Sequence, residues 1–449
     1  MFKKILIANR GEIAVRIIRA ARELGIETVA VYSEADRDAL HTSLADEAVC
    51  VGGPRSKDSY LNVENIISAT VLTGAEAIHP GFGFLSENSK FAKMCRDCNI
   101  IFIGPSPEII DKMGNKAQAK DIMKKAGVPI IIGSDGIIDT VEEGLEIAEK
   151  MGYPVLIKAS AGGGGKGMRL CYSKEEFVKG YTMAKGEALA SFGDDDVYVE
   201  KFIEEPKHIE FQILGDKFGN VIHLGERDCS VQRRNQKVIE EAPSPVMKDE
   251  VRWKMGAAAI KAAKAVNYEN AGTIEFLLDK NYNFYFMEMN TRIQVEHGIT
   301  ETVTGIDLVK EQIKIAAGER LNITQEMIKI NGAAIECRIN AENTSLDFRP
   351  SPGKITKLIS PGGPGIRLDS AVYEGYSISP LYDSMIGKLI AYGRDREEAI
   401  ARMKRALGEY LIQGIDTNIE YQLSILENPV FISGNYNTSF VKNELSNNI

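Results

Sequence analysis

The stretch that decides the fold is Glu288-Met289-Asn290-Thr291-Arg292-Ile293-Gln294-Val295-Glu296-His297. Between its first and last glutamate it brings two carboxylates, two amides and one guanidinium into nine residues. Read with the two-residue period of a β-strand, Phe284, Phe286, Glu288 and Asn290 share one face. Arg292, Gln294 and Glu296 continue the same alternation, which favours a site for anions over a polar sheet face in solvent.

A second strand precedes this stretch, over residues 273–278, with Glu275 on the face opposite to Ile274 and Phe276. The connector over 280–283 is rich in turn-forming residues, so we predict a hairpin that sets Glu275 near Glu288. Two carboxylates and the amide oxygen of Asn290 are hard ligands that suit Mg²⁺ bridging nucleotide phosphates. The hairpin therefore predicts a metal site, with Mn²⁺ as the alternative ion.

Composition limits the possible functions. The chain has 449 residues, of which 44% are hydrophobic and 26% charged, as in an ordinary globular protein of about three domains. Its net charge of −9 argues against a chain-wide nucleic-acid surface. No apolar run approaches the ~18 residues of a membrane span. Six scattered cysteines imply no disulfide framework, so we expect a cytoplasmic protein.

The order of predicted elements indicates an α/β fold in three regions. Residues 1–114 alternate strand and helix, which predicts a parallel α/β domain. Residues 115–330 form the second region, and within it about 131–203 is a smaller α/β insert. Residues 331–449 form a third, mixed α+β region, in which strands are expected over 333–340 and 353–360 and a helix over 396–411.

A glycine-rich loop, Ala161-Gly162-Gly163-Gly164-Gly165-Lys166-Gly167-Met168, follows the strand that ends at Lys158. Lys166 is followed by glycine instead of Ser or Thr, so this is not a Walker A loop. Four successive glycines allow backbone N–H groups to close over phosphates, and their flexibility suits a mobile lid. Lys158 and Lys116 add two positive charges for phosphate oxygens, although either alone is equally typical of a surface lysine.

Three further segments carry alternating polar residues. Over 208–212, His208, Glu210 and Gln212 share one face, which is suited to ribose hydroxyls or to orienting an arginine. Residues 226–238 are expected to form a dense basic loop, with four cations in eleven residues that indicate an anion site. On the strand 335–342, Arg338 lies among carboxylates and is therefore pre-positioned to stabilise a developing oxyanion. The alternatives are a solvated sheet face for the first segment and ion-paired surfaces for the other two.

Taken together, these residues resemble the biotin carboxylase component of biotin-dependent carboxylases, in the ATP-grasp superfamily. The similarity runs from the segment 5–14 (Ile5-Leu6-Ile7-Ala8-Asn9-Arg10-Gly11-Glu12-Ile13-Ala14) to about residue 440. It includes 77–88 (Ala77-Ile78-His79-Pro80-Gly81-Phe82-Gly83-Phe84-Leu85-Ser86-Glu87-Asn88), the glycine loop, 288–297 and 382–388. The resemblance implies an ATP-grasp fold with a glycine-rich lid. It also implies a reaction in which ATP phosphorylates bicarbonate to carboxyphosphate, which breaks down to CO₂ and phosphate. Phosphate then takes the N1 proton of biotin, and the resulting enolate captures CO₂.

The resemblance also assigns residues. The nucleotide ligands it implies are Lys116, Lys158, Gly162, Gly163, Gly164, Gly165, Lys166, Gly167, Glu200, Lys201, Ile203, His208, Gln232, Asn235, Glu275, Leu277 and Glu288. Glu275, Glu288 and Asn290 form the implied metal site, and Lys237, Arg292, Gln294 and Val295 the implied bicarbonate site. The implied catalytic residues are Lys237, Arg292, Glu296 as the base that deprotonates bicarbonate, and Arg338, which stabilises the biotin enolate. Phe82 and Arg338 would contact biotin. We expect Arg292 to keep Glu296 ionised.

Three positions depart from the family pattern. Asn235 replaces a histidine near the nucleotide, Gly298 replaces a proline and loosens its segment, and Phe82 replaces a tyrosine near biotin. No Ala-Met-Lys-Met attachment sequence is present, so we expect action on a separate biotinylated carrier, with separate carboxyltransferase subunits and a homodimeric enzyme. We expect the first half-reaction of acetyl-CoA carboxylase. The alternatives are a split pyruvate or other acyl-CoA carboxylase, another ATP-grasp ligase, and a non-catalytic nucleotide-binding subunit.

Overall fold

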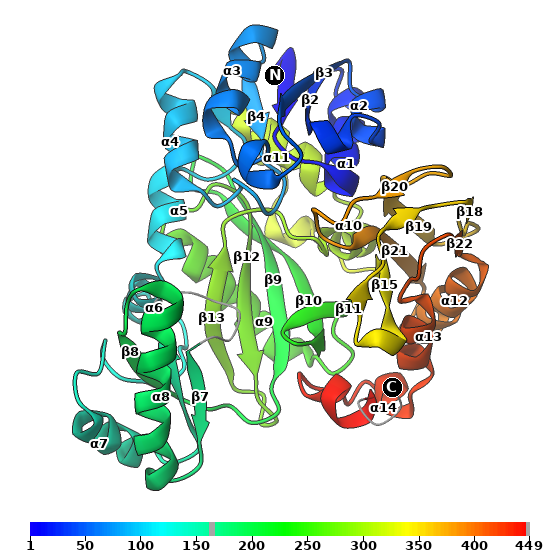
Figure 1. Cartoon of the computed structure of the whole chain (residues 1–449). Helices are drawn as coiled ribbons and strands as arrows, with labels where there is room; N and C mark the ends of the chain where they lie inside the picture. Colours follow the sequence, from blue (N-terminus) through cyan, green and yellow to red (C-terminus); the bar gives the residue numbers. More distant parts are fainter. Residues whose placement is uncertain (161–166, 446–449) are drawn as a thin grey trace.

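The first domain of the computed structural model, shown in Figure 1, is built on a five-stranded parallel sheet. The model describes residues 1–160 and 167–445. The sheet order is β3-β2-β1-β4-β5. Its strands are β1 (Lys4–Ile7), β2 (Glu27–Ser33), β3 (Glu47–Gly52), β4 (Ala77–His79) and β5 (Ile101–Phe102), and its main helices are α1 (Gly11–Glu23), α3 (Val63–Thr73) and α4 (Ser89–Asp97). Apolar residues of β1 and α1 are fully buried against each other, so the predicted parallel α/β domain is confirmed.

An eight-stranded sheet fills the centre of the molecule, in the order β13-β12-β9-β10-β11-β14-β21-β19 (Figure 1). Its strands are β9 (Lys207–Gly215), β10 (Val221–Arg233), β11 (Gln236–Ala242), β12 (Asn270–Leu278), β13 (Phe284–Asn290), β14 (Ala333–Asn340), β19 (Ile366–Ser370) and β21 (Met385–Gly393). Helix α9 (Asp249–Ala265) covers one face, where its alanines pack on Phe211 and Phe276. The sheet continues across residue 330, so strands from the second and third regions share one hydrogen-bonded surface.

The predicted hairpin forms, and Glu275 pairs directly with Glu288 across β12 and β13. The prediction that Phe284 and Phe286 share a face with Glu288 is wrong. A β-bulge at Met287 inserts one extra residue, because Glu275 pairs with Glu288 while its neighbour Phe276 pairs with Phe286. The aromatic residues consequently face the core beneath the sheet, and Glu288 lies on the other side.

The insert forms a separate small layer that stands away from the body at the lower left of Figure 1. Strands β6 (Val155–Ala159), β7 (Met168–Cys171) and β8 (Val197–Lys201) form an antiparallel sheet in the order β7-β6-β8, covered by α7 (Val141–Met151) and α8 (Lys174–Phe192). Its own core includes Phe177 and Val199. Residues 162–166 of the predicted phosphate loop lie outside the described residues. Gly167, at the end of that loop, has a φ of +70° and accepts a hydrogen bond from Ala159.

Two further sequence-based assignments are wrong. The basic segment 226–238 is not a loop, because β10 and β11 form a hairpin whose two turn residues, Arg234 and Asn235, have positive φ angles. The strand expected over 353–360 is two short strands, β17 (Gly353–Lys354) and β18 (Lys357–Ile359). They separate because β17 pairs with β20 (Ser377–Ile378), whereas β18 pairs with β22 (Leu411–Gln413).

The remaining elements connect these layers. The helices are α2 (Leu40–Leu44), α5 (Pro107–Gly114), α6 (Lys116–Lys125), α10 (His297–Thr304), α11 (Leu308–Ala316), α12 (Arg396–Glu409), α13 (Ile419–Glu427) and α14 (Pro429–Ser433), and the last short strands are β15 (Glu342–Asn343) and β16 (Arg349–Pro350). Of the described helices, none is both long and apolar enough to cross a membrane.

Candidate functional site

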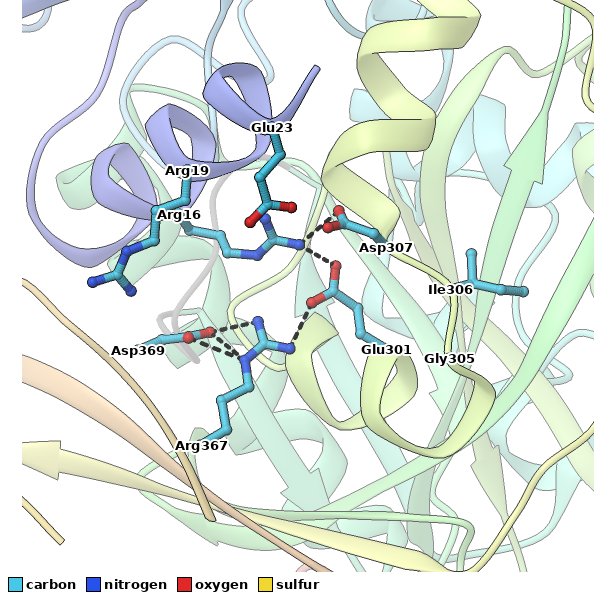
Figure 2. A pocket seen from close by; sticks show the side chains of 9 residues that line it. All are labelled: Arg16, Arg19, Glu23, Glu301, Gly305, Ile306, Asp307, Arg367 and Asp369. Carbon is cyan, nitrogen blue, oxygen red and sulfur yellow. Dashed lines mark hydrogen bonds and ion pairs between the residues drawn. The ribbon is translucent and has the colours of Figure 1, made fainter. Parts of the chain in front are cut away.

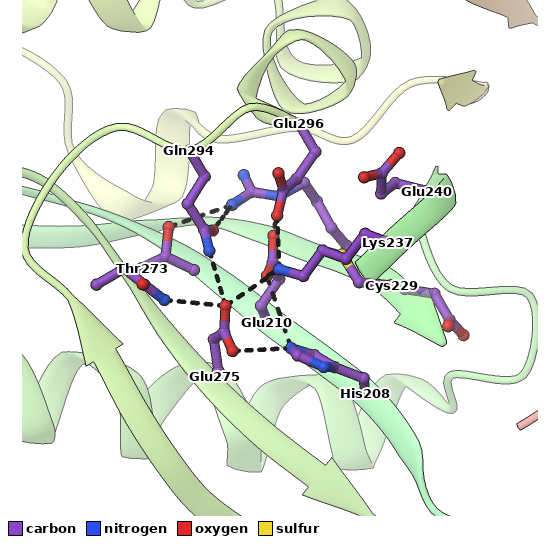
Figure 3. A network of polar contacts seen from close by, with 12 residues as sticks. His208, Glu210, Cys229, Lys237, Glu240, Thr273, Glu275, Gln294 and Glu296 are labelled. Carbon is purple, nitrogen blue, oxygen red and sulfur yellow. Dashed lines mark hydrogen bonds and ion pairs between the residues drawn. The ribbon is translucent and has the colours of Figure 1, made fainter. Parts of the chain in front are cut away.

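Glu296 belongs to a buried polar network on one face of the central sheet (Figure 3). Its carboxylate accepts hydrogen bonds from Lys237 Nζ at 2.6 Å and from Arg338 Nη2 at 2.9 Å, and only 2% of the residue is exposed. Burial alone would raise the pKa of Glu296, but these two cations outweigh it and hold the pKa well below its usual range. The site therefore keeps Glu296 ionised.

Lys237 joins three carboxylates that come from three different segments. Its ammonium donates to Glu210 at 2.6 Å, to Glu275 at 3.1 Å and to Glu296 at 2.6 Å. Burial works against the charge of Lys237, yet the surrounding carboxylates raise its pKa above the ordinary value. A permanently charged lysine at this point is suited to hold a small anion that enters the site.

The predicted metal ligands are brought together on the β12–β13 hairpin. Asn290 Nδ2 donates to Glu275 Oε1 at 2.9 Å, and Glu288 is the cross-strand neighbour of Glu275. Burial and the nearby Glu275 raise the pKa of Glu288, which reflects the cost of placing two carboxylates side by side. A divalent cation would relieve that repulsion, so this donor set fits Mg²⁺ or Mn²⁺.

His208, Glu210 and Gln212 share one face of β9, as predicted. Every residue of β9 is buried, so the alternative of a solvated sheet face is wrong. His208 Nε2 lies 3.0 Å from Glu275, whose negative charge raises the pKa of His208 against the effect of burial. Glu210 and Gln212 accept hydrogen bonds from Arg227, at 2.5 and 2.7 Å. The expectation that this stripe orients an arginine is thus confirmed, and the arginine is Arg227.

Arg227 is fully buried and also fixes the side chain of Gln294, which the resemblance assigns to the bicarbonate site. Its Nη2 donates to Gln294 Oε1 at 2.8 Å, while Gln294 Nε2 donates to Glu275 at 2.7 Å. The side chain of Gln294 is thereby fixed between a cation and a carboxylate. Of the four cations in segment 226–238, Arg227 and Lys237 belong to this network, whereas Arg233 and Arg234 bind Asp347 at the surface.

Arg292 is placed differently from the expectation. Its Nε donates to Glu87 at 2.8 Å and its Nη2 to Asn290 Oδ1 at 3.1 Å. The hydrogen bonds that keep Glu296 ionised come from Lys237 and Arg338 instead. The reason is tertiary, because Glu87 belongs to the first domain and draws the guanidinium toward the domain boundary.

The predicted phosphate ligands lie at the edge of the hairpin and in the insert. Lys116, at the start of α6, lines a pocket together with Glu288 and Asn290. Lys158 Nζ donates to Glu200 at 2.6 Å, and Glu200 also pairs with Lys120. Burial of Glu200 is outweighed by these two lysines, which lower its pKa.

The other predicted nucleotide and biotin contacts are more dispersed. Lys201 donates to the carbonyls of Gly152 and Tyr153, at 2.9 and 3.0 Å, so its ammonium supports the insert. Leu277 pairs with His208 across the sheet, and Gln232 lies 2.9 Å from the ring of His208. Ile203 follows β8, Asn235 is exposed at the β10–β11 turn, and the backbone carbonyl of Phe82 accepts from Asn9 at 2.7 Å. The roles of Phe82 and Arg338 toward biotin stay predictions.

Sequence reasoning missed several residues of the network. Glu240, fully buried on β11, accepts from Arg338 Nε at 2.7 Å, and burial raises its pKa to about 7. Lys120 and Glu87 were also missed. Glu87 stands inside the segment 77–88, where an acidic residue beside Ser86 and Asn88 is the only sequence signal. Glu240 offers a weaker signal, as the first of two adjacent glutamates in a strand.

Comparison with known proteins places this geometry in a family. Residues 1–110 match the biotin carboxylase N-terminal domain, 115–324 the ATP-binding domain of the carbamoyl-phosphate synthase L chain, and 336–443 the biotin carboxylase C-terminal domain. The chain is 63% identical over 441 residues to a biotin carboxylase of Nostoc sp. and 60% identical over 443 residues to biotin carboxylase 1 of Bacillus subtilis. Each alignment covers 98% of this chain, and it covers 99% and 98% of the two relatives, respectively.

Other similar proteins include parts of pyruvate carboxylase and 2-oxoglutarate carboxylase. A pyruvate carboxylase subunit of Methanothermobacter thermautotrophicus is 57% identical, with 98% of this chain and 90% of that protein covered. A Campylobacter jejuni biotin carboxylase solved with a β,γ-ATP ligand superimposes with a TM-score of 0.94 at 53% identity, covering 98% and 99% of the two chains. The biotin carboxylase domain dimer of Hydrogenobacter thermophilus 2-oxoglutarate carboxylase, solved with MgADP, ADP and bicarbonate, gives 0.93 at 54% identity, covering 98% and 97%.

Proposed function

Because this chain belongs to the biotin carboxylase family, we propose that it carboxylates biotin on a separate carrier protein, with ATP and bicarbonate as the other substrates. The reaction would proceed through carboxyphosphate, as the first half-reaction of acetyl-CoA carboxylase. One observation carries the proposal. A buried, ionised glutamate, Glu296, lies between Lys237 and Arg338 and beside the oxygen ligands of the β12–β13 hairpin.

In this proposal Glu296 is the base that takes the proton of bicarbonate. In the ligand-free protein its two cations make it a weak base, because they hold its pKa low. An entering bicarbonate anion competes for the same donors. As Lys237 and Arg338 turn part of their hydrogen bonding to the substrate, the pKa of Glu296 rises and the carboxylate becomes able to accept the proton.

Arg338 acts on the biotin side of the site. It lies on the rigid strand β14 and is held by Glu240 at 2.7 Å. A guanidinium fixed in this way needs little rearrangement to stabilise negative charge as it develops on the ureido oxygen of biotin. Gln294, fixed by Arg227, and Arg292, fixed by Glu87, complete the proposed bicarbonate site.

Glu275, Glu288 and Asn290 would hold a divalent cation, which screens the charge of the nucleotide phosphates when it is bound. Lys116 and Lys158 would contact phosphate oxygens. Lys158 is paired with Glu200 in this structure, so nucleotide binding would require Lys158 to exchange one anionic partner for another. Solved relatives support the ligand set, since one is a complex with MgADP, ADP and bicarbonate.

The direct test is release of phosphate from MgATP in the presence of bicarbonate, with and without free biotin. We expect biotin to raise the rate strongly, with carboxybiotin formed in step. The assay is repeated with a purified biotinylated carrier domain. Tight MgATP binding without stimulation by either acceptor would overturn the proposal and favour a non-catalytic subunit.

Substitution of Glu296 tests the assignment of the base. Glu296→Gln keeps the shape of the side chain and should lower biotin carboxylation by roughly 10²–10⁴-fold, the usual contribution of a general base. MgADP affinity should stay within about threefold, because neither the hairpin ligands nor Lys116 changes. Glu326→Gln, at an exposed position, is the matched control. Activity of Glu296→Gln equal to that of the control would remove Glu296 as the base.

Arg338 is tested by comparing two activities. Arg338→Met should lower biotin carboxylation by roughly 10²–10³-fold, the usual cost of losing one electrostatic stabiliser. Bicarbonate-dependent ATP cleavage should fall less than biotin carboxylation, because Lys237 still contacts Glu296 in the bicarbonate step, whereas the biotin enolate loses its proposed stabiliser. Equal loss of both activities would place Arg338 in the bicarbonate step instead.

The same half-reaction in a split pyruvate or 2-oxoglutarate carboxylase is the second candidate, since relatives with 57% and 54% identity carry those names. A carrier captured by the tagged chain from its own cells, with its carboxyltransferase identified by mass spectrometry, separates the two. We also propose a homodimer, which light scattering of the purified protein tests. A dimeric relative domain supports this assembly.

A further inference from the structure

Lys388 contacts the turn over residues 294–297, which contains Glu296, and the proposed mechanism does not use this contact. Lys388 lies in segment 382–388, which is part of the family resemblance but contains none of the residues that the resemblance assigns to the site. Its ammonium donates to the backbone carbonyl of Val295 at 2.7 Å, one residue before Glu296. The two residues are 93 positions apart in the chain, and the Lys388 side chain is completely buried.

The strand pairing places Lys388 next to Arg338. The two residues are direct cross-strand partners on β21 and β14. Arg338 binds the carboxylate of Glu296, and Lys388 binds the peptide group that precedes Glu296. One pair of strands thus holds the same glutamate at its side chain and at its backbone.

Two cations side by side, one of them fully buried, repel each other, so the arrangement needs acids beside Lys388. Glu12, on the first turn of α1, lies 3.2 Å from Lys388, and Asp369 on β19 lies 3.9 Å away. Glu336 shares the interior with them and is fully buried on β14. Among the described residues, neither carboxylate oxygen of Glu336 accepts a hydrogen bond, so its role is electrostatic.

The acids around Lys388 continue into a second network, which lines the pocket in Figure 2. Arg367 donates to Asp369 at 2.7 Å and lies 2.8 Å from Glu301, which also accepts from Arg16. Asp369 Oδ2, the oxygen that lies 3.9 Å from Lys388, is thus also held by Arg367. One counter-charge of Lys388, Asp369, is therefore itself held in place.

We propose that Lys388, supported by Glu12, is a positioning residue that fixes the Val295–Glu296 peptide and so aims the Glu296 carboxylate at bicarbonate. This inference rests on the proposed function. The carbonyl of Gln294, by contrast, has local contacts, with the ring of His297 at 2.8 Å and with the backbone N–H of His297 at 3.3 Å. Lys388 connects the turn to β21, the strand that pairs with the one carrying Arg338. A displacement of about 1 Å at a reacting group is enough to cost roughly 10²-fold in rate.

The test compares Lys388→Met with Arg396→Met. Arg396 is a matched control, because it also joins a buried carboxylate, Glu241, to backbone carbonyls, of Phe431 and Ile432, but does not contact the 294–297 turn. We expect Lys388→Met to raise the KM for bicarbonate or lower kcat by about 10–100-fold, while the KM for MgATP changes less than threefold. Arg396→Met should lower stability without separating the two KM values.

Lys388→Met leaves the buried carboxylate of Glu12 without its cation, which could by itself unfold the protein. A second variant separates this effect from the positioning role. The double substitution Glu12→Gln and Lys388→Met removes both charges and should fold while keeping the bicarbonate defect. Unchanged bicarbonate kinetics in the folded double variant would overturn the positioning role.

Hydrogen exchange gives a readout that does not depend on activity. Amides of the 293–299 segment should exchange about tenfold faster in the double variant than in Arg396→Met, because the turn loses its tie to β21. Equal exchange overturns the inference even if the wild-type chain proves inactive. An inactive wild type with faster exchange in the double variant would contradict the proposed function and leave the tie established.

Discussion

Replacement of Arg227 should destabilise the protein more than almost any other single substitution. The side chain is fully buried and donates five hydrogen bonds, to Glu210, Gln212, Thr273, Gln294 and Thr300. Arg227→Met keeps most of the apolar stem but removes every donor. Glu210 keeps one cation, Lys237, whereas the four neutral acceptors lose a buried partner.

The expected cost follows from these contacts. Breaking a buried ion pair from one side costs about 3–5 kcal/mol, because the remaining charge stays buried. The retained bond from Lys237 reduces that figure, while the neutral acceptors add to it. We therefore expect a loss of about 4 kcal/mol, a large part of the roughly 5–15 kcal/mol that stabilises a typical domain.

Urea unfolding followed by far-ultraviolet circular dichroism measures this loss. Arg234→Met is the control, since Arg234 makes only an exposed ion pair with Asp347, worth about 0–1 kcal/mol. Adding Glu210→Gln to Arg227→Met should recover part of the loss, because no uncompensated carboxylate then remains. An Arg227→Met transition that coincides with that of Arg234→Met would refute the reasoning.

Three further outcomes are expected. Glu87→Gln should raise the KM for bicarbonate about tenfold and leave MgATP binding unchanged, because it frees the guanidinium of Arg292; equal KM values for wild type and variant would count against it. A β-carbon at Gly298 would stand 2.5 Å from Ile390 Cδ1. Gly298→Ala should therefore be less stable alone than when it is combined with Ile390→Val, by at least about 0.5 kcal/mol in thermal unfolding. Additive effects of the two substitutions on stability would disprove the clash. Burial lowers the pKa of His41 to about 4, so the unfolded chain takes up a proton below about pH 6.5 that the folded chain refuses, and stability falls as the pH drops from 6.5 toward 4. His41→Gln should reduce the loss of stability between pH 7.5 and 5 by about 2 kcal/mol in urea titrations, and identical pH slopes would exclude this contribution.

The structure also clarifies the departures at Gly298 and Asn235. The expectation that Gly298 loosens its segment is wrong. Gly298 is buried in the first turn of α10, and Ile390 fills the space beside it. Asn235 occupies a turn position with a φ of +64°, a conformation that asparagine adopts readily. Its difference from the family pattern therefore fits the hairpin turn, and its effect on nucleotide affinity stays a prediction.

The sequence by itself determined the local framework of the site. Alternation along 273–278 and the turn-rich connector that follows it were enough to predict the hairpin that places Glu275 opposite Glu288, although the bulge interrupts the alternation expected along 284–290. The same two-residue period put Glu210 and Gln212 on one face of β9, where they orient an arginine. These predictions succeeded because strand periodicity and turn chemistry depend only on neighbouring residues.

Only the tertiary structure decided how the site is charged and held. Contacts between distant segments determine three features: the bulge at Met287, the ion pair of Arg292 with Glu87, and the hydrogen bond from the buried Lys388 to the carbonyl of Val295. No local pattern marks them, since an exposed lysine and a buried one look alike in sequence. Packing removes water from these groups, and in that environment each charge must find a partner wherever the fold supplies one.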